Sequence, residues 1–194
     1  MTGCAGCDIT DLQRDLRAEF PKYSLQWKKH SPLMRAIDVF LKIITFGFMS
    51  TFMVDFITTI GFTVYVPDCW ASMTDGNRLI VLRHERVHMR QRVKYGSFLF
   101  SFLYLFCPLP AGLAYFRMKF EREAYEETLQ ATYDVYQSYA NTPKFKEEII
   151  RNFTGPAYFW MWPFPKSMRS WFDRASAAVL VGDPSASPSA NLKA

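Results

Sequence analysis

The chain has 194 residues, of which 49% are hydrophobic and 17% aromatic, and its formal net charge is +5. This length fits one domain with tails, and the composition supplies enough apolar side chains for a core. The basic residues are dispersed without a run of five like charges, so we expect no nucleic-acid partner. The first 30 residues are polar and charged, so we expect no secretory signal and a cytoplasmic protein.

The N-terminal part of the chain is predicted to contain two helices. Residues 8–20 have the pattern of a short amphipathic helix that ends before a proline. Ser31 followed by Pro32 is typical of a helix start, and the apolar run 33–46 continues this second helix until a glycine.

Strand residues and then a long helix follow. The segment 56–66 is rich in β-branched and aromatic residues, which predicts strand structure with a bulge or turn at Gly61. A helix is expected next, capped by Asn77 and continuing to Gly96, because no proline or glycine interrupts it. Beyond it we expect an apolar connection over residues 97–113 and two helices over 113–139 and 144–153. An irregular aromatic covering over 158–165 and a disordered tail over 182–194 complete the chain.

Two apolar stretches, 39–66 and 98–116, are candidates for membrane-spanning segments. Charged residues interrupt the first, and prolines and a glycine divide the second, so neither supplies the about 20 apolar residues that a spanning helix needs. We interpret both as core segments or an exposed apolar hairpin. The alternative is a membrane-associated protein that is anchored by the hairpin 97–116.

Four cysteines are too few for a disulfide framework in a chain of this length. Cys4 and Cys7 have the CxxC spacing of half a zinc ribbon or of a redox pair, but no second CxxC follows. We therefore expect free thiols in a reducing compartment.

The stretch 84–88, His-Glu-Arg-Val-His, contains two of the three histidines in the chain. On a helix, His84 and His88 lie one above the other on the same face, so both imidazoles can bind one metal ion. Glu85 is close enough to contact a water molecule on that metal without binding the metal itself. This H-E-x-x-H pattern is that of zinc peptidases, in which the glutamate is the general base. The alternative, a chance match on an exposed charged helix, is disfavoured because the scarce histidines are concentrated here.

A zinc ion with an open catalytic position needs a third protein ligand. His30 lies far upstream, so we expect this ligand from the acidic cluster 121–127, whose alternative interpretation is a solvated helix face. Glu121 and Glu123 are two residues apart, so on a helix they point about 200° from each other and cannot both face one metal. Glu121 shares its face with Met118, Ala124, Tyr125 and Thr128. Because this face leads toward the core, we select Glu121 as the ligand and keep Glu123 as the alternative.

The order of elements in this chain resembles that of the gluzincin clan of zinc metallopeptidases. A strand segment is followed by an H-E-x-x-H helix, a short connection and a second helix that carries Glu-x-x-Ala. The compact size is similar to the minimal, minigluzincin-type members. The resemblance covers about residues 56–136 and rests on His84, Glu85, His88 and the motif 121–125. It implies an α+β, predominantly helical, small zincin-like fold. In this fold a short sheet with an edge strand precedes the H-E-x-x-H helix, and a second helix bears the third zinc ligand.

The resemblance also implies a mechanism for a protein or peptide substrate. Strand 62–66 would be an edge strand that binds an extended peptide through main-chain hydrogen bonds. The peptide bond would be hydrolysed through a zinc-bound water, with Glu85 as general base. An oxyanion donor is also implied, and Tyr115, Tyr125 and Tyr158 are the candidates. In many relatives the downstream motif ends in Asp, where this chain has Tyr125.

The expected organisation has three parts: an N-terminal helical segment 1–30, a metallopeptidase domain 31–175 and a flexible tail 176–194. A latent peptidase is one variant of this hypothesis, because the region 140–194 is long enough to cover the cleft. The main alternative is a catalytically silent zinc-binding structural or regulatory protein that binds a partner through the aromatic segment 158–172.

Overall fold

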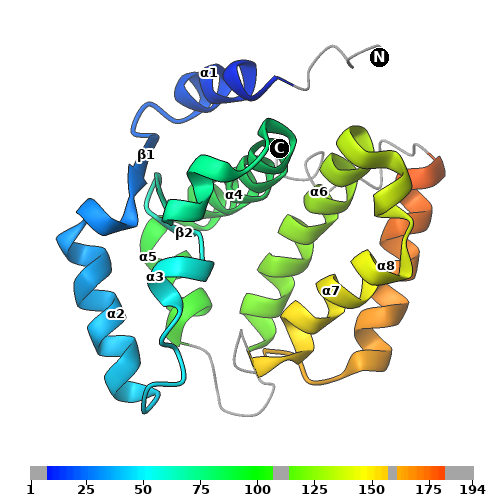
Figure 1. The fold of residues 1–194 in the computed structure, drawn as a ribbon. Coiled ribbons are helices and arrows are strands. Elements are labelled where there is room, and N and C mark those ends of the chain that lie inside the picture. The colour runs from blue at the N-terminus through cyan, green and yellow to red at the C-terminus, as the bar shows by residue number, and fades with distance from the viewer. Residues whose placement is uncertain (1–7, 107–113, 157–160, 182–194) are drawn as a thin grey trace. The chain divides into compact units, whose positions relative to one another are not determined.

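The computed structural model describes residues 8–106, 114–156 and 161–181 (Figure 1). It is predominantly helical with a small three-stranded sheet, which confirms the predicted α+β class. The described residues divide into two compact units, 8–79 and from 80 onward. None of the described helices combines the length and the apolar character needed to cross a bilayer.

The helices of the first unit are α1 (Ile9–Glu19), α2 (Pro32–Ile44) and the short α3 (Phe52–Asp55). The first two helices confirm the predictions. The Asp8 side chain accepts a hydrogen bond from the Thr10 amide and caps α1, and Ser31 Oγ accepts from the Met34 amide and caps α2. Helix α3 was not predicted, because a single turn within an apolar run has no periodicity to mark it.

The sheet of the first unit contains β1 (Ser24–Trp27), β2 (Thr58–Ile60) and β3 (Thr63–Val66) in the order β1-β3-β2. Strands β2 and β3 form an antiparallel hairpin, and Gly61 between them has a φ of 67°, a conformation that glycine adopts without strain. The predicted interruption at Gly61 is therefore confirmed. Strand β1 pairs in parallel with the other side of β3. The prediction that 62–66 is an edge strand was therefore wrong, since β3 is the central strand.

Lys28 is the most deeply buried charged side chain of the first unit. Lys28 is 1% exposed; its Nζ donates a 2.7 Å hydrogen bond to the Phe52 carbonyl and lies 3.6 Å from the centre of the Phe52 ring. Phe52 belongs to the small core that also contains Met34 and Tyr65. Burial lowers the pKa of Lys28 to about 8, and the nearby Asp38 carboxylate only partly opposes this.

The described elements of the second unit are helical. Helix α4 (Asp75–Tyr95) begins in the first unit and continues into the second. It is followed by α5 (Ser97–Ser101), the π-helical turn η3 (Phe102–Phe106), α6 (Tyr115–Ala140), α7 (Pro143–Thr154) and α8 (Pro165–Val181). The predicted helices are confirmed with small shifts of their ends. The predicted cap was wrong: Thr74 Oγ1, not Asn77, caps α4 by accepting from the Asn77 amide.

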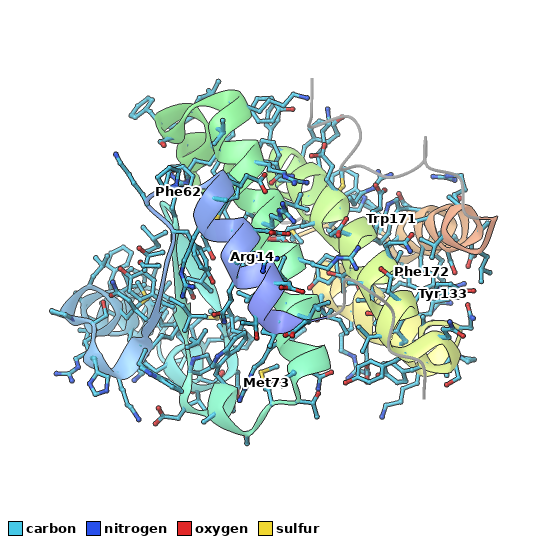
Figure 2. The ribbon with its side chains drawn as sticks, turned by 90° about the horizontal axis from the view of Figure 1, so that it is seen from above. Arg14, Phe62, Met73, Tyr133, Trp171 and Phe172 are labelled. Carbon is cyan, nitrogen blue, oxygen red and sulfur yellow. The ribbon has the colours of Figure 1, made fainter. Side chains whose placement is uncertain are left out.

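Helix α8 was not predicted, although it closes the core of the second unit. Figure 1 shows α7 and α8 beside α6. Trp171 and Phe172 of α8, labelled in Figure 2, pack against rings on α7: Trp171 lies 5.3 Å from Phe153, and Phe172 lies 6.3 Å from Phe145. Trp171 Nε1 also donates a 2.7 Å hydrogen bond to Glu126 on α6. These contacts fix α6, which carries part of the site.

Candidate metal centre

Two helices of the second unit bring the predicted metal ligands together. His84 and His88 lie one turn apart on α4, and Glu121 lies on α6. The Glu121 side chain is 3% exposed and those of His84 and His88 are 16% and 10% exposed. Among the described residues, these three form the one group of potential ligands whose atoms converge on a single point.

The distances between the ligand atoms fit a small tetrahedral ion. The Nε2 atoms of His84 and His88 are 3.2 Å apart. Glu121 Oε2 lies 3.6 Å from His84 Nε2, and Oε1 lies 3.8 Å from His88 Nε2. Ligand atoms about 2.1 Å from a tetrahedral ion are roughly 3.4 Å from one another. The three side chains are therefore already at the separations that such an ion requires.

Gln91 determines which nitrogen of His88 faces this point. Its Nε2 donates to the Phe120 carbonyl (3.0 Å) and to Glu123 Oε2 (2.9 Å), both of which only accept hydrogen bonds. Gln91 Oε1 therefore faces His88 Nδ1, 2.9 Å away, and this nitrogen must carry the proton that Oε1 accepts. The lone pair of neutral His88 is then on Nε2, which points at the other two ligands.

Thr128 fixes His84 in the same way. The Thr128 hydroxyl donates to the Ala124 carbonyl at 3.1 Å, so its oxygen is left to accept from His84 Nδ1 at 2.9 Å. This tautomer leaves Nε2 of His84 free to bind a metal ion. Both imidazoles are thus oriented by residues that do not themselves reach the metal position.

The electrostatics of the cluster favour a bound cation. Burial alone would raise the pKa of Glu121, but His88, His84 and Arg117 outweigh it and lower this pKa to about 2. Burial alone would lower the pKa of His84, yet its hydrogen bond to Glu121 and the charges of Glu121 and Glu85 raise it overall. The cluster therefore holds an ionised carboxylate beside two imidazoles and stabilises positive charge at their Nε2 atoms.

The other predicted site residues occupy distinct positions. Glu85 is buried on α4 next to His84 and is not one of the converging ligands. Glu123 accepts the hydrogen bond from Gln91 instead of facing the imidazoles. Glu127, another acid of the cluster 121–127, pairs with Arg83 at 2.6 Å and so links α6 to α4.

The candidate tyrosines differ in their distance from the cluster. The ring of Tyr125 lies 4.9 Å from that of His84, but its hydroxyl accepts a 2.8 Å hydrogen bond from Asn152. Tyr115 is half exposed and packs against Trp162. Tyr158 lies outside the described residues, as do Cys4, Cys7 and Cys107.

A tyrosine that the sequence did not indicate reaches the cluster. Tyr104, on the π-helical turn η3, donates a hydrogen bond from its hydroxyl to Glu121 Oε1, and its ring lies 5.8 Å from that of His88. The apolar run in which Tyr104 lies gave no signal of this role. Gln91 and Thr128 were also absent from the predicted site, although helical spacing places Thr128 on the face of Glu121.

Comparisons of the chain with protein-family models, with curated proteins and with solved structures found no match. The interpretation of the site therefore rests on its own geometry and chemistry.

Proposed function

We propose that this protein is a zinc-dependent metalloendopeptidase of the H-E-x-x-H plus glutamate type, with His84, His88 and Glu121 as ligands and Glu85 as general base. The observation that carries the proposal is the convergence of two Nε2 atoms and one carboxylate beside a buried glutamate that is not a ligand. Two imidazoles and one carboxylate are a ligand set that zinc takes in catalytic sites, where the fourth position stays open. Structural zinc sites are instead closed by four protein ligands.

The metal and the protein would divide the chemistry between them. A zinc ion in this site would supply a Lewis acid and lower the pKa of a bound water to about 7. Glu85 would accept the proton of the attacking water on its carboxylate and deliver it to the nitrogen of the leaving amine. Gln91 and Thr128 would hold both imidazoles in the tautomer that binds metal through Nε2. Tyr104, whose hydroxyl donates to Glu121 Oε1, would hold the Glu121 carboxylate.

The proposed substrate is a protein or peptide, because the H-E-x-x-H pattern with a glutamate base is that of zinc peptidases. Strand 62–66 does not support the peptide subsite that the family resemblance implied, because both of its edges are already paired. We therefore assign no main-chain recognition to that strand.

Substitution of Glu85 by Gln tests the proposal. It removes the base without removing a ligand, so zinc content and fold should stay unchanged while hydrolysis of a casein substrate falls about 10²–10⁴-fold. The assay uses the purified full chain with its zinc content measured in the same sample. Stoichiometric zinc without any cleavage by the unsubstituted protein would favour the catalytically silent zinc protein. An unchanged rate in Glu85→Gln would show that Glu85 is not the base.

A further inference from the structure

Helix α2 in the first unit exposes an apolar face to solvent. Its exposed apolar residues and those of the turn that follows are Leu33, Val39, Phe40, Ile43, Ile44 and Phe46. Phe46 is 99% exposed and Ile43 is 67% exposed. An apolar face of this size on a small unit marks an interaction surface, because single exposed apolar residues are usually scattered.

The core of the first unit does not need this face. The opposite side of α2 contributes Met34, which is fully buried against Phe52 and Tyr65, with Ile37 and Leu41 packed beside them. At about 100° per residue, Leu33, Val39, Phe40 and Ile43 lie on the other side of the helix from Met34. Helix α2 is therefore apolar on both faces, and only one face has a partner within its own unit.

The border of the exposed face is positively charged. On the helix, Arg35 and Lys42 lie along one edge of the apolar face, and both are exposed. Asp38 on the same edge is buried and bonded to Lys42 at 2.7 Å. Lys42 and Asp38 neutralise each other, so Arg35, whose guanidinium donates a hydrogen bond to the Lys29 carbonyl, supplies the net charge of this edge. The surface therefore combines exposed apolar side chains with a net charge of +1 at its border, from Arg35 and Lys42 against Asp38.

We propose that the exposed face of α2 docks in the plane of an anionic lipid bilayer, with Ile43 and Phe46 inserted between the head groups. Apolar side chains on one face with Lys and Arg at its border are characteristic of interfacial helices. The 13 residues of α2 extend about 20 Å, which is shorter than the about 30 Å hydrocarbon core, so the helix lies on the membrane and does not span it.

Charge favours a membrane over a second copy of the chain. In a two-fold symmetric dimer the same patch would face itself, so its net charge of +1 would meet a like charge, whereas an anionic bilayer would meet it with negative charge. An anionic lipid surface attracts each exposed lysine or arginine near it by about 1 kcal/mol, which corresponds to roughly fivefold in affinity. This inference concerns the first unit only and does not depend on the metal centre.

Vesicle co-sedimentation of the full chain tests the proposal, with phosphatidylcholine vesicles compared with vesicles that also contain phosphatidylglycerol. We expect binding to the anionic vesicles that decreases with salt. The double variant Ile43→Ser/Phe46→Ser should lower the affinity at least tenfold, because both side chains lose apolar burial. Arg35→Gln should lower it about fivefold. Val93→Ser is the matched control, since Val93 is 64% exposed on α4, outside this face.

Three outcomes would overturn the proposal. The first is an absence of binding to either kind of vesicle. The second is equal binding by the double variant and the unsubstituted chain. The third is a dimer in solution that the double variant converts to monomer, without vesicle binding, which would assign the face to a second copy. Circular dichroism of each variant verifies that the exposed substitutions leave the fold intact.

Discussion

Substitution of Gln91 by Met tests how strongly the candidate metal centre depends on residues that are not among its three potential ligands. Gln91 is fully buried on α4 and makes hydrogen bonds to His88, to the Phe120 carbonyl and to Glu123. Methionine has nearly the same length and shape but can neither accept the proton of His88 Nδ1 nor donate to Glu123. The substitution therefore removes three hydrogen bonds without opening a large cavity.

The expected loss follows from these contacts. Each hydrogen bond to a neutral partner contributes about 1 kcal/mol to the free energy of unfolding, and the bond to the charged Glu123 contributes about 1.5–3 kcal/mol. Glu123 is only half-buried and regains water, so we expect Gln91→Met to destabilise the metal-free protein by about 3 kcal/mol. The His88 ring would lose its orienting partner, and metal affinity should fall about 10–100-fold.

Two measurements on the same variants check this prediction. Urea unfolding of the metal-free protein gives the stability, and competition with a chromophoric chelator gives the zinc affinity. Gln130→Met is the matched control, because Gln130 is half-buried on α6 and its amide donates to Asp134, outside the cluster. Unchanged zinc affinity in Gln91→Met, or an equal loss in Gln130→Met, would refute the role of Gln91 in orienting His88.

Two further predictions concern buried polar groups. Thr128→Val removes the acceptor of His84 Nδ1, so zinc affinity should fall about tenfold in the chelator competition, whereas Thr132→Val, a buried control on the same helix, should leave it unchanged. For Lys28, whose pKa is lowered from 10.5 to about 8, the unfolded chain binds more protons than the folded chain between these pH values. The free energy of unfolding in urea should therefore rise by about 3 kcal/mol between pH 8 and about pH 10.5 in the unsubstituted protein, relative to its change in Lys28→Met. Parallel pH profiles of the two proteins would contradict this.

The sequence predicted the three side chains that meet in the candidate metal centre, because helical geometry is local. The spacing of His84 and His88 places both on one face of any helix. Once α6 is recognised as a helix, Glu121 and Glu123 must point about 200° apart, so they can be told from each other. Gln91 and Thr128 could not be selected in this way, since polar residues on a helix are usually solvated. Their roles depend on which side chain of the facing helix lies opposite, and this is fixed by packing.

The incorrect or missing fold predictions have a different origin. Strand β1 has only four residues, Ser24–Trp27, and it is defined by pairing with β3, which lies far along the chain. Without β1, β3 looks like an edge strand, which explains the incorrect assignment of 62–66. Helix α8 follows an aromatic and proline-rich segment that hid its start. Its inward face becomes clear only when Trp171 and Phe172 are seen against α7.

The zinc affinities of Glu121→Ala and Glu123→Ala, measured side by side by chelator competition, test the central claim most directly. Glu121 converges with the two imidazoles, whereas Glu123 is bonded to Gln91. We expect Glu121→Ala to lose zinc as severely as His84→Ala or His88→Ala, because two remaining ligands cannot retain it against a competitor. Glu123→Ala should remain close to the unsubstituted protein. Full zinc occupancy in Glu121→Ala, or a greater loss in Glu123→Ala, would contradict the assignment of the metal centre.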